Sequence, residues 1–591
     1  MKHLKPSYRV ILKYTLLGPL ICYLTYFLAT RINQLVFSEA QGPYLFIESL
    51  GVYALILPIF ILSKSHSLFS LFSFTLCLVG IAANNLKMRT LATPIDPSDF
   101  HLLNELLNIA NGKQKLILTV ITALLAYLAL RKIKFRTSNF LCAFIWILLL
   151  TTAVYQGATY QKFWQNFLGN NLLTPQTAYK YQGFALNLLY ASAANVQQTR
   201  DYPKFDEIQN IIDEDAILAK STNTHSLADK EQLDIYYIAA ESLNFEENQK
   251  NELSPYHQGS GSPYLYVSRL GGGTANSELE ALCGIQAQYN EIYFVKGVNS
   301  SLPCLPQLLH NQGFNSFAFH ANDKAFYNRE NTYKQMGFQK FYSQRDYTPK
   351  RLQKNMPLFL PDKVFFKKST EFISEIRAKS KKNFFHLMTL SLHYPFESAD
   401  IEIRKKQKDL SPQENYTIAR GESIQAIFNF TEAIKKSKRN SLIFIFGDHQ
   451  PTYGTERFTI SNDLSRHTIP AMILYKNAEQ NNFTPIALKS AHLSSLFYVV
   501  DEALKLESPQ RSQHSLYELS QNYLVFPENK IVDLRTKDSC YLKQSNRACE
   551  SILKLESNAH KITDDIFFGK NYFCQLRSCN GSNRRATAQA D

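Results

Sequence analysis

The stretch Gly271-Gly-Gly-Thr-Ala-Asn-Ser-Glu-Leu-Glu-Ala-Leu-Cys-Gly284 places three glycines directly before a threonine that opens a helical pattern. Glycine lets the backbone turn sharply and approach a ligand closely. The N-terminus of a helix presents unpaired N–H groups and a partial positive charge. Together these features predict a seat for a phosphate or a similar anion, with the hydroxyl of Thr274 beside it. The alternative is a flexible turn before an ordinary capped helix, and the motifs downstream decide between the two.

Length and charge limit the class of protein. A chain of 591 residues predicts several structural units. The formal net charge of +14 is compatible with nucleic-acid binding, but the sequence has no zinc-finger spacing and no basic–aromatic array. Long apolar runs are confined to the first ~160 residues. A basic membrane protein that faces anionic lipid therefore fits better, and we expect no nucleic-acid partner.

The cysteines fall into two groups. Three of them, Cys22, Cys77 and Cys142, lie inside apolar runs and are expected to be buried small hydrophobes. The other six form three sequence-close couples, Cys283 with Cys304, Cys540 with Cys549 and Cys574 with Cys579. An even number at short spacings favours disulfide bonds and an oxidising compartment. Metal binding is the alternative, although no couple has Cys-x-x-Cys spacing.

The N-terminal part is expected to cross a membrane. Five apolar segments are long enough, or nearly so, to span a bilayer as helices. They are Val10–Ala29, Tyr44–Ser63, Ser67–Asn85, Leu116–Leu130 and Phe140–Tyr155. If all five cross, the basic N-terminus, Lys64 and the basic loop Arg131–Arg136 share one side, which the positive-inside rule makes cytoplasmic. An odd number of spans then places the rest of the chain outside, in agreement with the cysteines.

Beyond residue 231, short apolar runs alternate with helical patterns. The expected strands are Leu233–Ala240, Asn315–His320, Phe384–Leu390, Ser441–Phe446 and Ile469–Tyr475, and the expected helices include Ser277–Leu282, Pro303–Asn311 and Gly421–Lys435. This order predicts an α/β domain with a mainly parallel sheet covered by helices. We therefore expect four parts, namely a transmembrane domain at 1–157, a juxtamembrane linker at 158–230, a catalytic domain at 231–510 and a C-terminal extension at 511–591 that ends in a disordered tail.

Polar or ionisable side chains follow four of the expected strands. They are Glu241-Ser242, His320-Ala-Asn322, Ser391-Leu-His393 and Gly447-Asp448-His449. In parallel sheets, ligands bind beyond the carboxyl ends of the strands. We therefore expect these side chains to gather at one edge. Each one alone has an ordinary explanation as a cap or a loop residue, but their shared placement favours a functional site.

The residue types at this edge predict a reaction. Glu241, Asp448, His449 and Thr274 supply three oxygen ligands and one nitrogen ligand, a set suited to Mn²⁺, Mg²⁺ or Zn²⁺. A metal would activate the Thr274 hydroxyl for attack on phosphorus, giving a phospho-threonine intermediate. Arg329, in Phe326-Tyr-Asn-Arg329, is suited to bidentate phosphate binding. His393 would protonate a leaving oxygen or bind phosphate.

In combination and order these motifs resemble the lipoteichoic acid synthase type of sulfatase-like phosphotransferases, in the alkaline phosphatase superfamily. The resemblance rests on Glu241, Gly273–Glu278, Phe326–Arg329, Ser391–Phe396 and Gly447–His449, and on the five spans. It implies that Glu241, Thr274, Asp448 and His449 bind a metal, usually Mn²⁺. It also implies that Thr274 is the nucleophile and that Arg329 and His393 bind substrate phosphate.

The resemblance also implies a substrate class and a location. Such enzymes move glycerol phosphate or a related head group from a phospholipid to a glycan or lipid acceptor of the cell envelope. The Cys283 and Cys304 couple resembles that of periplasmic glucan phosphoglycerol transferases, which implies a bacterial inner-membrane protein with a periplasmic catalytic domain. A phosphoethanolamine transferase, a phosphodiesterase or other hydrolase, and a non-catalytic membrane-anchored binding protein are the alternatives. A sulfate ester hydrolase is disfavoured because Cys304-Leu-Pro-Gln-Leu308 has Leu where the sulfatase pattern requires Arg.

Overall fold

The computed structural model describes residues 17–37, 45–62, parts of 73–81 and 143–149, Ser192 and, with gaps, 202–577. The gaps in the last range are 216–226, 245–263, 268–272, 288–292, 297–302, 323, 325, 348–359, 452–463, 490, 527–529, 542–546 and 568. The chain divides into two compact units, Met1–Asp201 and Tyr202–Asp591, and each is described by itself. The finer domain bounds expected from the sequence remain predictions.

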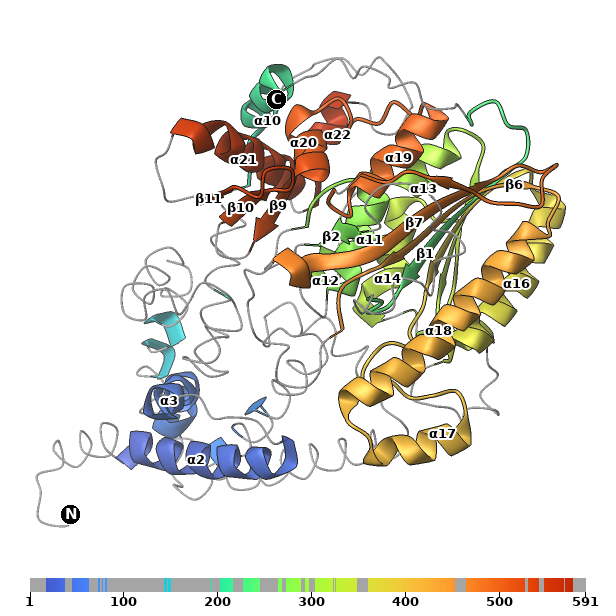
Figure 1. Cartoon of the computed structure of the whole chain (residues 1–591). Helices are drawn as coiled ribbons and strands as arrows, with labels where there is room; N and C mark the ends of the chain where they lie inside the picture. Colours follow the sequence, from blue (N-terminus) through green and yellow to red (C-terminus); the bar gives the residue numbers. More distant parts are fainter. Residues whose placement is uncertain are drawn as a thin grey trace, which may run out of the picture. The chain divides into compact units, whose positions relative to one another are not determined.

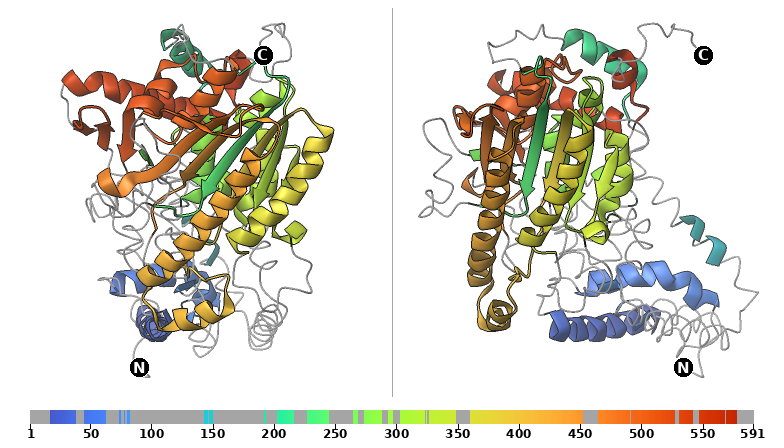
Figure 2. Two further views of the ribbon diagram at one scale, coloured as in Figure 1. Left: turned by 45° about the vertical axis from the view of Figure 1, so that its right-hand side comes forward. Right: turned by 90° about the vertical axis from the view of Figure 1, so that its right-hand side faces the viewer.

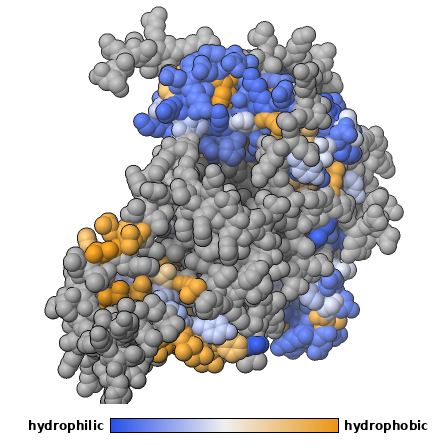
Figure 3. Space-filling model, turned by 90° about the vertical axis from the view of Figure 1, so that its left-hand side faces the viewer, coloured by the Kyte–Doolittle hydropathy of each residue, from blue (hydrophilic) through white to orange (hydrophobic). Residues whose placement is uncertain are grey.

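The N-terminal unit contains two packed helices, α2 (Gly18–Phe37) and α3 (Leu45–Leu62). They overlap the first two expected apolar segments, whereas the third to fifth lie largely outside the described residues. Over the described parts of the chain, no helix has both the length and the apolar character needed to cross a membrane. The unit does expose large apolar side chains, visible as orange patches in Figure 3. They include Leu20, Leu24, Leu28, Phe144, Ile145, Leu148 and Leu149.

A mainly parallel sheet forms the centre of the C-terminal unit, as the sequence predicted. Its order is β2-β7-β6-β1-β5-β3-β4, with β8 paired to β7. The pairs from β6 through β1, β5 and β3 to β4 are parallel, and the pairs made by β7 are antiparallel. The strands are β1 Leu233–Ala240, β2 Tyr264–Tyr266, β3 Asn315–His320, β4 Lys340–Tyr342, β5 Lys382–Met388, β6 Asn440–Gly447, β7 Thr468–Lys476 and β8 Thr484–Ile486.

Helices cover both faces of this sheet, so its central strands are buried and read as near-continuous apolar runs (Figures 1 and 2). One face packs on α16 (Asp362–Lys379) and α18 (Pro412–Lys435) through a large apolar cluster. The other face packs on α11 (Thr274–Cys283), α13 (Leu305–His310), α14 (Arg329–Met336) and α19 (Ser495–Leu504). Smaller helices are α10 Phe205–Glu214, α12 Tyr293–Lys296, η7 Phe326–Asn328, α15 Gln344–Tyr347, α17 Ile401–Lys406, η9 Gln407–Asp409 and η11 Leu464–His467.

The residues after α19 form a further layer on the same unit. Their described part forms a three-stranded antiparallel sheet and three helices. These elements are α20 His514–Asn522, β9 Tyr523–Phe526, β10 Lys530–Asp533, β11 Ser539–Tyr541, α21 Arg547–Phe567 and α22 Tyr572–Arg577. Tyr266 of β2 packs in one apolar cluster with side chains from this small sheet. The C-terminal extension is therefore built onto the edge of the main sheet.

The cysteine prediction is confirmed wherever the structure describes both partners. Cys283 is bonded to Cys304 and Cys540 to Cys549. Cys574 is also disulfide-bonded, while its expected partner Cys579 lies outside the described residues. Cys22 and Cys77 are free and buried, as expected, and Cys142 lies outside the described residues.

Candidate functional site

Four of the six predicted site residues lie together at the carboxyl end of the sheet. The hydroxyl of Thr274 donates to Glu241 Oε2 at 3.2 Å and lies 3.3 Å from His449 Nε2. The same nitrogen of His449 is 3.4 Å from Glu241 Oε1 and 3.4 Å from Asp448 Oδ2. All four residues are buried. The site therefore lies where the C-terminal ends of β1 and β6 come together with the N-terminus of α11.

The two strand exits are tied to each other by short polar contacts. Ser242, with a left-handed φ of 49°, donates its backbone N–H to Asp448 Oδ1 at 2.7 Å and its hydroxyl to Glu241 Oε1 at 2.9 Å. At the end of β6, a Cβ added to Gly447 would collide with the carbonyl oxygen of Leu243. Only glycine fits such a close approach, so Gly447 lets Asp448 reach the exit of β1.

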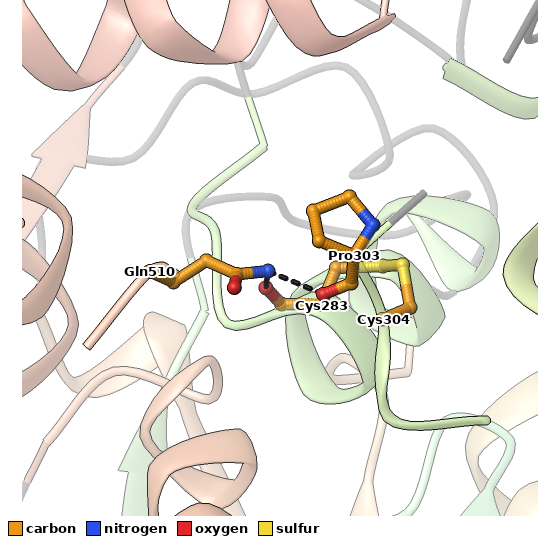
Figure 4. The surroundings of a disulfide bond; sticks show 4 residues. All are labelled: Cys283, Pro303, Cys304 and Gln510. Atoms are coloured by element: carbon orange, nitrogen blue, oxygen red, sulfur yellow. Dashed lines mark hydrogen bonds between the residues drawn. A yellow bond between two sulfur atoms is a disulfide. The ribbon is translucent and has the colours of Figure 1, made fainter. Parts of the chain in front are cut away.

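Helix α11, which begins with Thr274, is held near both of its ends by contacts with other parts of the chain. Near its start, the hydroxyl of Ser277 donates to the carbonyl of Asp448 at 2.7 Å. At its end, Cys283 forms the disulfide with Cys304. Figure 4 shows that the side-chain amide of Gln510 donates to the carbonyls of Cys283 and Pro303, on either side of this disulfide. The position of Thr274 is therefore set by contacts at both ends of its helix.

The donor atoms of this site fit a divalent metal ion. Glu241, Asp448 and His449 offer ligand atoms that all lie within 4.8 Å of one another. Oδ2 of Asp448 is buried and has no hydrogen-bond partner within the described part of the chain. Burial, and then the carboxylate of Glu241, raise the pKa of Asp448 to about 6. Paired buried carboxylates with a neighbouring imidazole are stabilised by a bound cation, which supplies the missing positive charge.

Arg329 is linked to these four residues through the helix that carries Thr274. It begins α14 and is buried, and its guanidinium pairs with Glu278 of α11. Glu278 stands one helical turn after Thr274. The predicted phosphate-binding residue therefore lies against the helix that carries the predicted nucleophile.

His393 lies in the turn that follows β5 and is partly exposed. Its Nδ1 is 2.8 Å from the carbonyl oxygen of Tyr394. The turn is held by the buried Asp362, whose Oδ1 accepts from the backbone N–H groups of Leu390 and Ser391 at 3.1 Å each. The roles assigned to Arg329 and His393 in the sequence analysis remain predictions.

Sequence reasoning missed several polar residues that shape this site. Glu278 belongs to the glycine–threonine motif but received no role. Ser242 was placed at a strand exit without a role of its own, and Asp362 and His386 were not singled out. Asp362 precedes an apolar–polar pattern and resembles an ordinary first-turn acid of a helix. Glu278 had one usable signal, because a Glu four residues after Thr274 shares its helix face and is buried in a domain of this kind.

Comparisons with known proteins agree with the motifs. Residues 261–506 match the family described as Sulfatase. The lipoteichoic acid synthase of Staphylococcus saprophyticus is 33% identical over 198 residues, which is 32% of this chain and 29% of the relative. The lipoteichoic acid synthase of Staphylococcus aureus strain USA300 is 35% identical over 165 residues, 27% of this chain and 24% of the relative. The matches thus span less than a third of the length of these curated relatives, and they confirm the resemblance that the motifs indicated.

Solved structures of related proteins have lower identity. The lipoteichoic acid synthase LtaP of Listeria monocytogenes is 17% identical and covers 64% of this chain and 98% of its own, with a TM-score of 0.45. The phosphoglycerol transferase GacH of Streptococcus pyogenes is 16% identical and covers 65% of this chain and 96% of its own, with a TM-score of 0.42.

Proposed function

We propose that this chain, whose residues 261–506 match the sulfatase family, is a membrane-anchored phosphotransferase. Its reaction moves phosphoglycerol, or a similar phosphorylated head group, from a phospholipid to a glycan or lipid acceptor of the cell envelope. The observation that carries the proposal is the contact of the Thr274 hydroxyl with both Glu241 and His449, at the start of a helix. The match to lipoteichoic acid synthases supports the choice of substrate class.

In the first half of the reaction, Thr274 Oγ1 attacks the phosphorus of the donor and loses its proton toward Glu241, to which it already donates. A bond forms between Oγ1 and phosphorus, and the bond between phosphorus and the lipid oxygen breaks. The lipid leaves as an alcohol after taking a proton, which we assign to His393. In the second half, an acceptor hydroxyl attacks the phosphorus of the phospho-threonine and gives its proton to His393. The bond between phosphorus and Thr274 Oγ1 breaks, and Oγ1 takes back the proton held by Glu241.

Two further groups stabilise the negative charge of the phosphoryl group. The N-terminal N–H groups of α11 face it with the positive end of the helix dipole. Arg329 is assigned to its non-bridging oxygens. Glu241, Thr274, Asp448 and His449 would hold a divalent ion, for which we propose Mn²⁺ with Mg²⁺ and Zn²⁺ as alternatives. Such an ion supplies positive charge that lowers the pKa of the attacking hydroxyl.

The proposed location is the bacterial inner membrane, with the N-terminus cytoplasmic and the catalytic unit on the outer side. Support comes from the apolar segments of the sequence, from the large apolar side chains exposed on the N-terminal unit, and from the disulfides of the C-terminal unit. The N-terminal unit would then be the membrane anchor and would keep the active site near its lipid donor.

The test uses membranes that contain the full chain, MnCl₂ and phosphatidylglycerol labelled in its head group. Wild-type protein is expected to move label onto an envelope acceptor, and Thr274→Ala is expected to lose at least about a thousandfold in rate because the nucleophile is gone. Thr274→Ser, which keeps a hydroxyl, is the matched control and should retain measurable transfer. Turnover by Thr274→Ala would contradict the mechanism. Label released only as free head group would instead support the hydrolase alternative.

A further inference from the structure

Glu278 is a buried carboxylate beside the site that the proposed reaction does not use. Its side chain is fully buried. Oε2 accepts from Arg329 Nε at 3.2 Å and from the hydroxyl of Tyr333 at 3.1 Å, and Oε1 accepts from Arg329 Nη2 at 3.2 Å. A carboxylate without access to water is strongly destabilising unless it is paired and hydrogen-bonded. Here the carboxylate is paired with the charge of Arg329, and it is hydrogen-bonded by both Arg329 and Tyr333.

The backbone makes an unusual turn to bring Arg329 to this carboxylate. Tyr327 and Asn328, the two residues before it, both have left-handed φ angles of 58° and 57°. Two consecutive non-glycine residues in this region are unfavourable and persist only where the surroundings fix them. The guanidinium also lies over the ring of Tyr327, with 5.2 Å between its carbon and the ring centroid. The unfavourable backbone conformation of Tyr327 and Asn328 thus accompanies the placement of the Arg329 side chain against Glu278.

Glu278 holds the guanidinium by one edge. The contacts involve Nε and Nη2, the two nitrogens on one edge of the planar guanidinium. Because Thr274 and Glu278 are four residues apart on α11, they share one face of the helix. The contact thus fixes the distance between the proposed nucleophile and the proposed phosphate-binding cation through a single turn of helix.

His386 does not replace Arg329 as the partner of Glu278. Its Nε2 lies 4.0 Å from Glu278 Oε1, and neither ring nitrogen has a hydrogen-bond partner within the described residues. Burial, and then the charge of Arg329, lower the pKa of His386 to about 3. The imidazole is therefore neutral at pH 7, and the positive charge that faces Glu278 comes from Arg329.

We infer that Glu278 is a positioning residue, which holds Arg329 at a fixed place relative to Thr274 so that the guanidinium can bind the substrate phosphate. The inference rests on the proposed function in one respect, namely the assignment of Arg329 to phosphate. In this assignment Glu278 does not touch the reacting atoms itself and acts through Arg329.

The experiment measures the binding of inorganic phosphate to the Mn²⁺-loaded full chain, by calorimetry at pH 7. The variants are Glu278→Gln, Glu278→Asp, Arg329→Gln and the double variant Glu278→Gln/Arg329→Gln. Glu280→Gln is the matched control, because Glu280 is a buried glutamate of the same helix that does not contact Arg329 in the described hydrogen bonds. Its Oε1 accepts from the backbone N–H of Ala287 at 3.0 Å and lies 3.7 Å from His492 Nε2. The thermal midpoint of each variant is recorded alongside.

Glu278→Gln and Arg329→Gln are each expected to weaken phosphate binding by about tenfold or more, the loss of a charge-assisted contact. Glu278→Asp should recover part of the affinity, and Glu280→Gln should bind as wild type does. The double variant should bind phosphate no more weakly than Arg329→Gln does. The reason is that Glu278 affects phosphate binding only through Arg329, so its loss has no further effect once Arg329 is gone. The double variant removes both charges together, so it keeps the test valid if Glu278→Gln alone is unstable.

Two results would overturn the inference. One is wild-type phosphate affinity in Glu278→Gln, and the other is an additional loss when Glu278→Gln is added to Arg329→Gln. A separate assay of head-group transfer distinguishes this failure from failure of the proposed function. If wild-type protein does not transfer the head group but the phosphate results hold, the positioning role stands and the proposed reaction falls. If transfer proceeds and Glu278→Gln binds phosphate normally, the reaction stands and the positioning role falls.

Discussion

The proposed role of Thr274 as a nucleophile depends on where its hydroxyl lies, and not on the chemistry of a threonine hydroxyl alone. It is the first residue of α11, so the helix dipole favours negative charge beside it. Its hydroxyl donates a hydrogen bond to Glu241 Oε2 at 3.2 Å and lies 3.3 Å from His449 Nε2. Exposed threonine hydroxyls have none of these partners. The buried setting also excludes water, which strengthens each of these electrostatic contacts.

A second buried glutamate on the same helix allows a prediction of pH dependence. Burial raises the pKa of Glu280 from 4.5 to about 8. The folded protein therefore binds this proton more tightly than the unfolded chain does. The stability that Glu280 contributes is complete below pH 4.5 and is lost as pH rises toward 8, by about 1.4 kcal/mol per pH unit.

We therefore expect Glu280→Gln to gain stability relative to wild type as pH increases from 5 to 8. His492, whose pKa burial lowers to about 3, is neutral throughout this range. Urea unfolding of both proteins at pH 5, 6, 7 and 8 measures the difference in unfolding free energy. A difference that stays constant across the four pH values would show that Glu280 does not carry a raised pKa.

At this scale the sequence identified the residues at strand exits but not the residues that support them. Glu241, Asp448 and His449 follow predictable strands, so their meeting point could be inferred from the strand pattern alone. Glu278 and Asp362 matter through contacts with residues that are far away in the sequence, such as Glu278 with Arg329 or Asp362 with Leu390. Their side chains carry no local pattern that reveals those partners.

Among the elements, α11 is the one that most determines the geometry of the site. It carries Thr274 and Glu278 on one face, and the disulfide Cys283–Cys304 joins its last residue to the residue before α13. Both cysteines are buried. This crosslink limits how far the C-terminal end of the helix can move, and hence how far Thr274 can move from Glu241.

We predict that Cys283→Ser/Cys304→Ser lowers the free energy of unfolding by about 3 kcal/mol, the value expected for a loop of this size. It should also slow head-group transfer at temperatures where the variant is still folded, because α11 is less well fixed. Urea unfolding and the transfer assay measure the two effects. Cys540→Ser/Cys549→Ser is the matched control, since that disulfide lies in the C-terminal extension. Equal slowing of transfer by both variants would contradict a specific role for the first disulfide.

Element boundaries were predictable where burial and periodicity agree. The bounds of β1 and β3 are those expected, and β7 is one residue longer at each end. Helix α18 begins at Pro412 rather than at Gly421, because a capping box formed by Ser411 and Glu414 starts it earlier. The strands β2, β4 and β8 were not predicted, since segments of three residues at sheet edges show no period.

At the scale of the whole molecule, the C-terminal unit is larger than the region that matches the sulfatase family. That match ends at residue 506, yet residues beyond it support the core of the site. Gln510 bonds to the carbonyls on either side of the α11 disulfide, and Leu524 and Phe526 pack with Tyr266 of the main sheet. The C-terminal extension is therefore a structural part of the unit that holds the candidate site.

The proposed reaction passes a phosphoryl group through Thr274. Intact-mass spectrometry tests this claim because it detects the covalent intermediate itself. The full chain would be incubated with Mn²⁺ and phospholipid vesicles, quenched in acid and digested to locate any adduct. We predict an added mass equal to one phosphorylated head group on Thr274, absent from Thr274→Ala, with the mass itself identifying the head group. Turnover of the lipid with no adduct on Thr274, or an adduct on another residue, would contradict the claim.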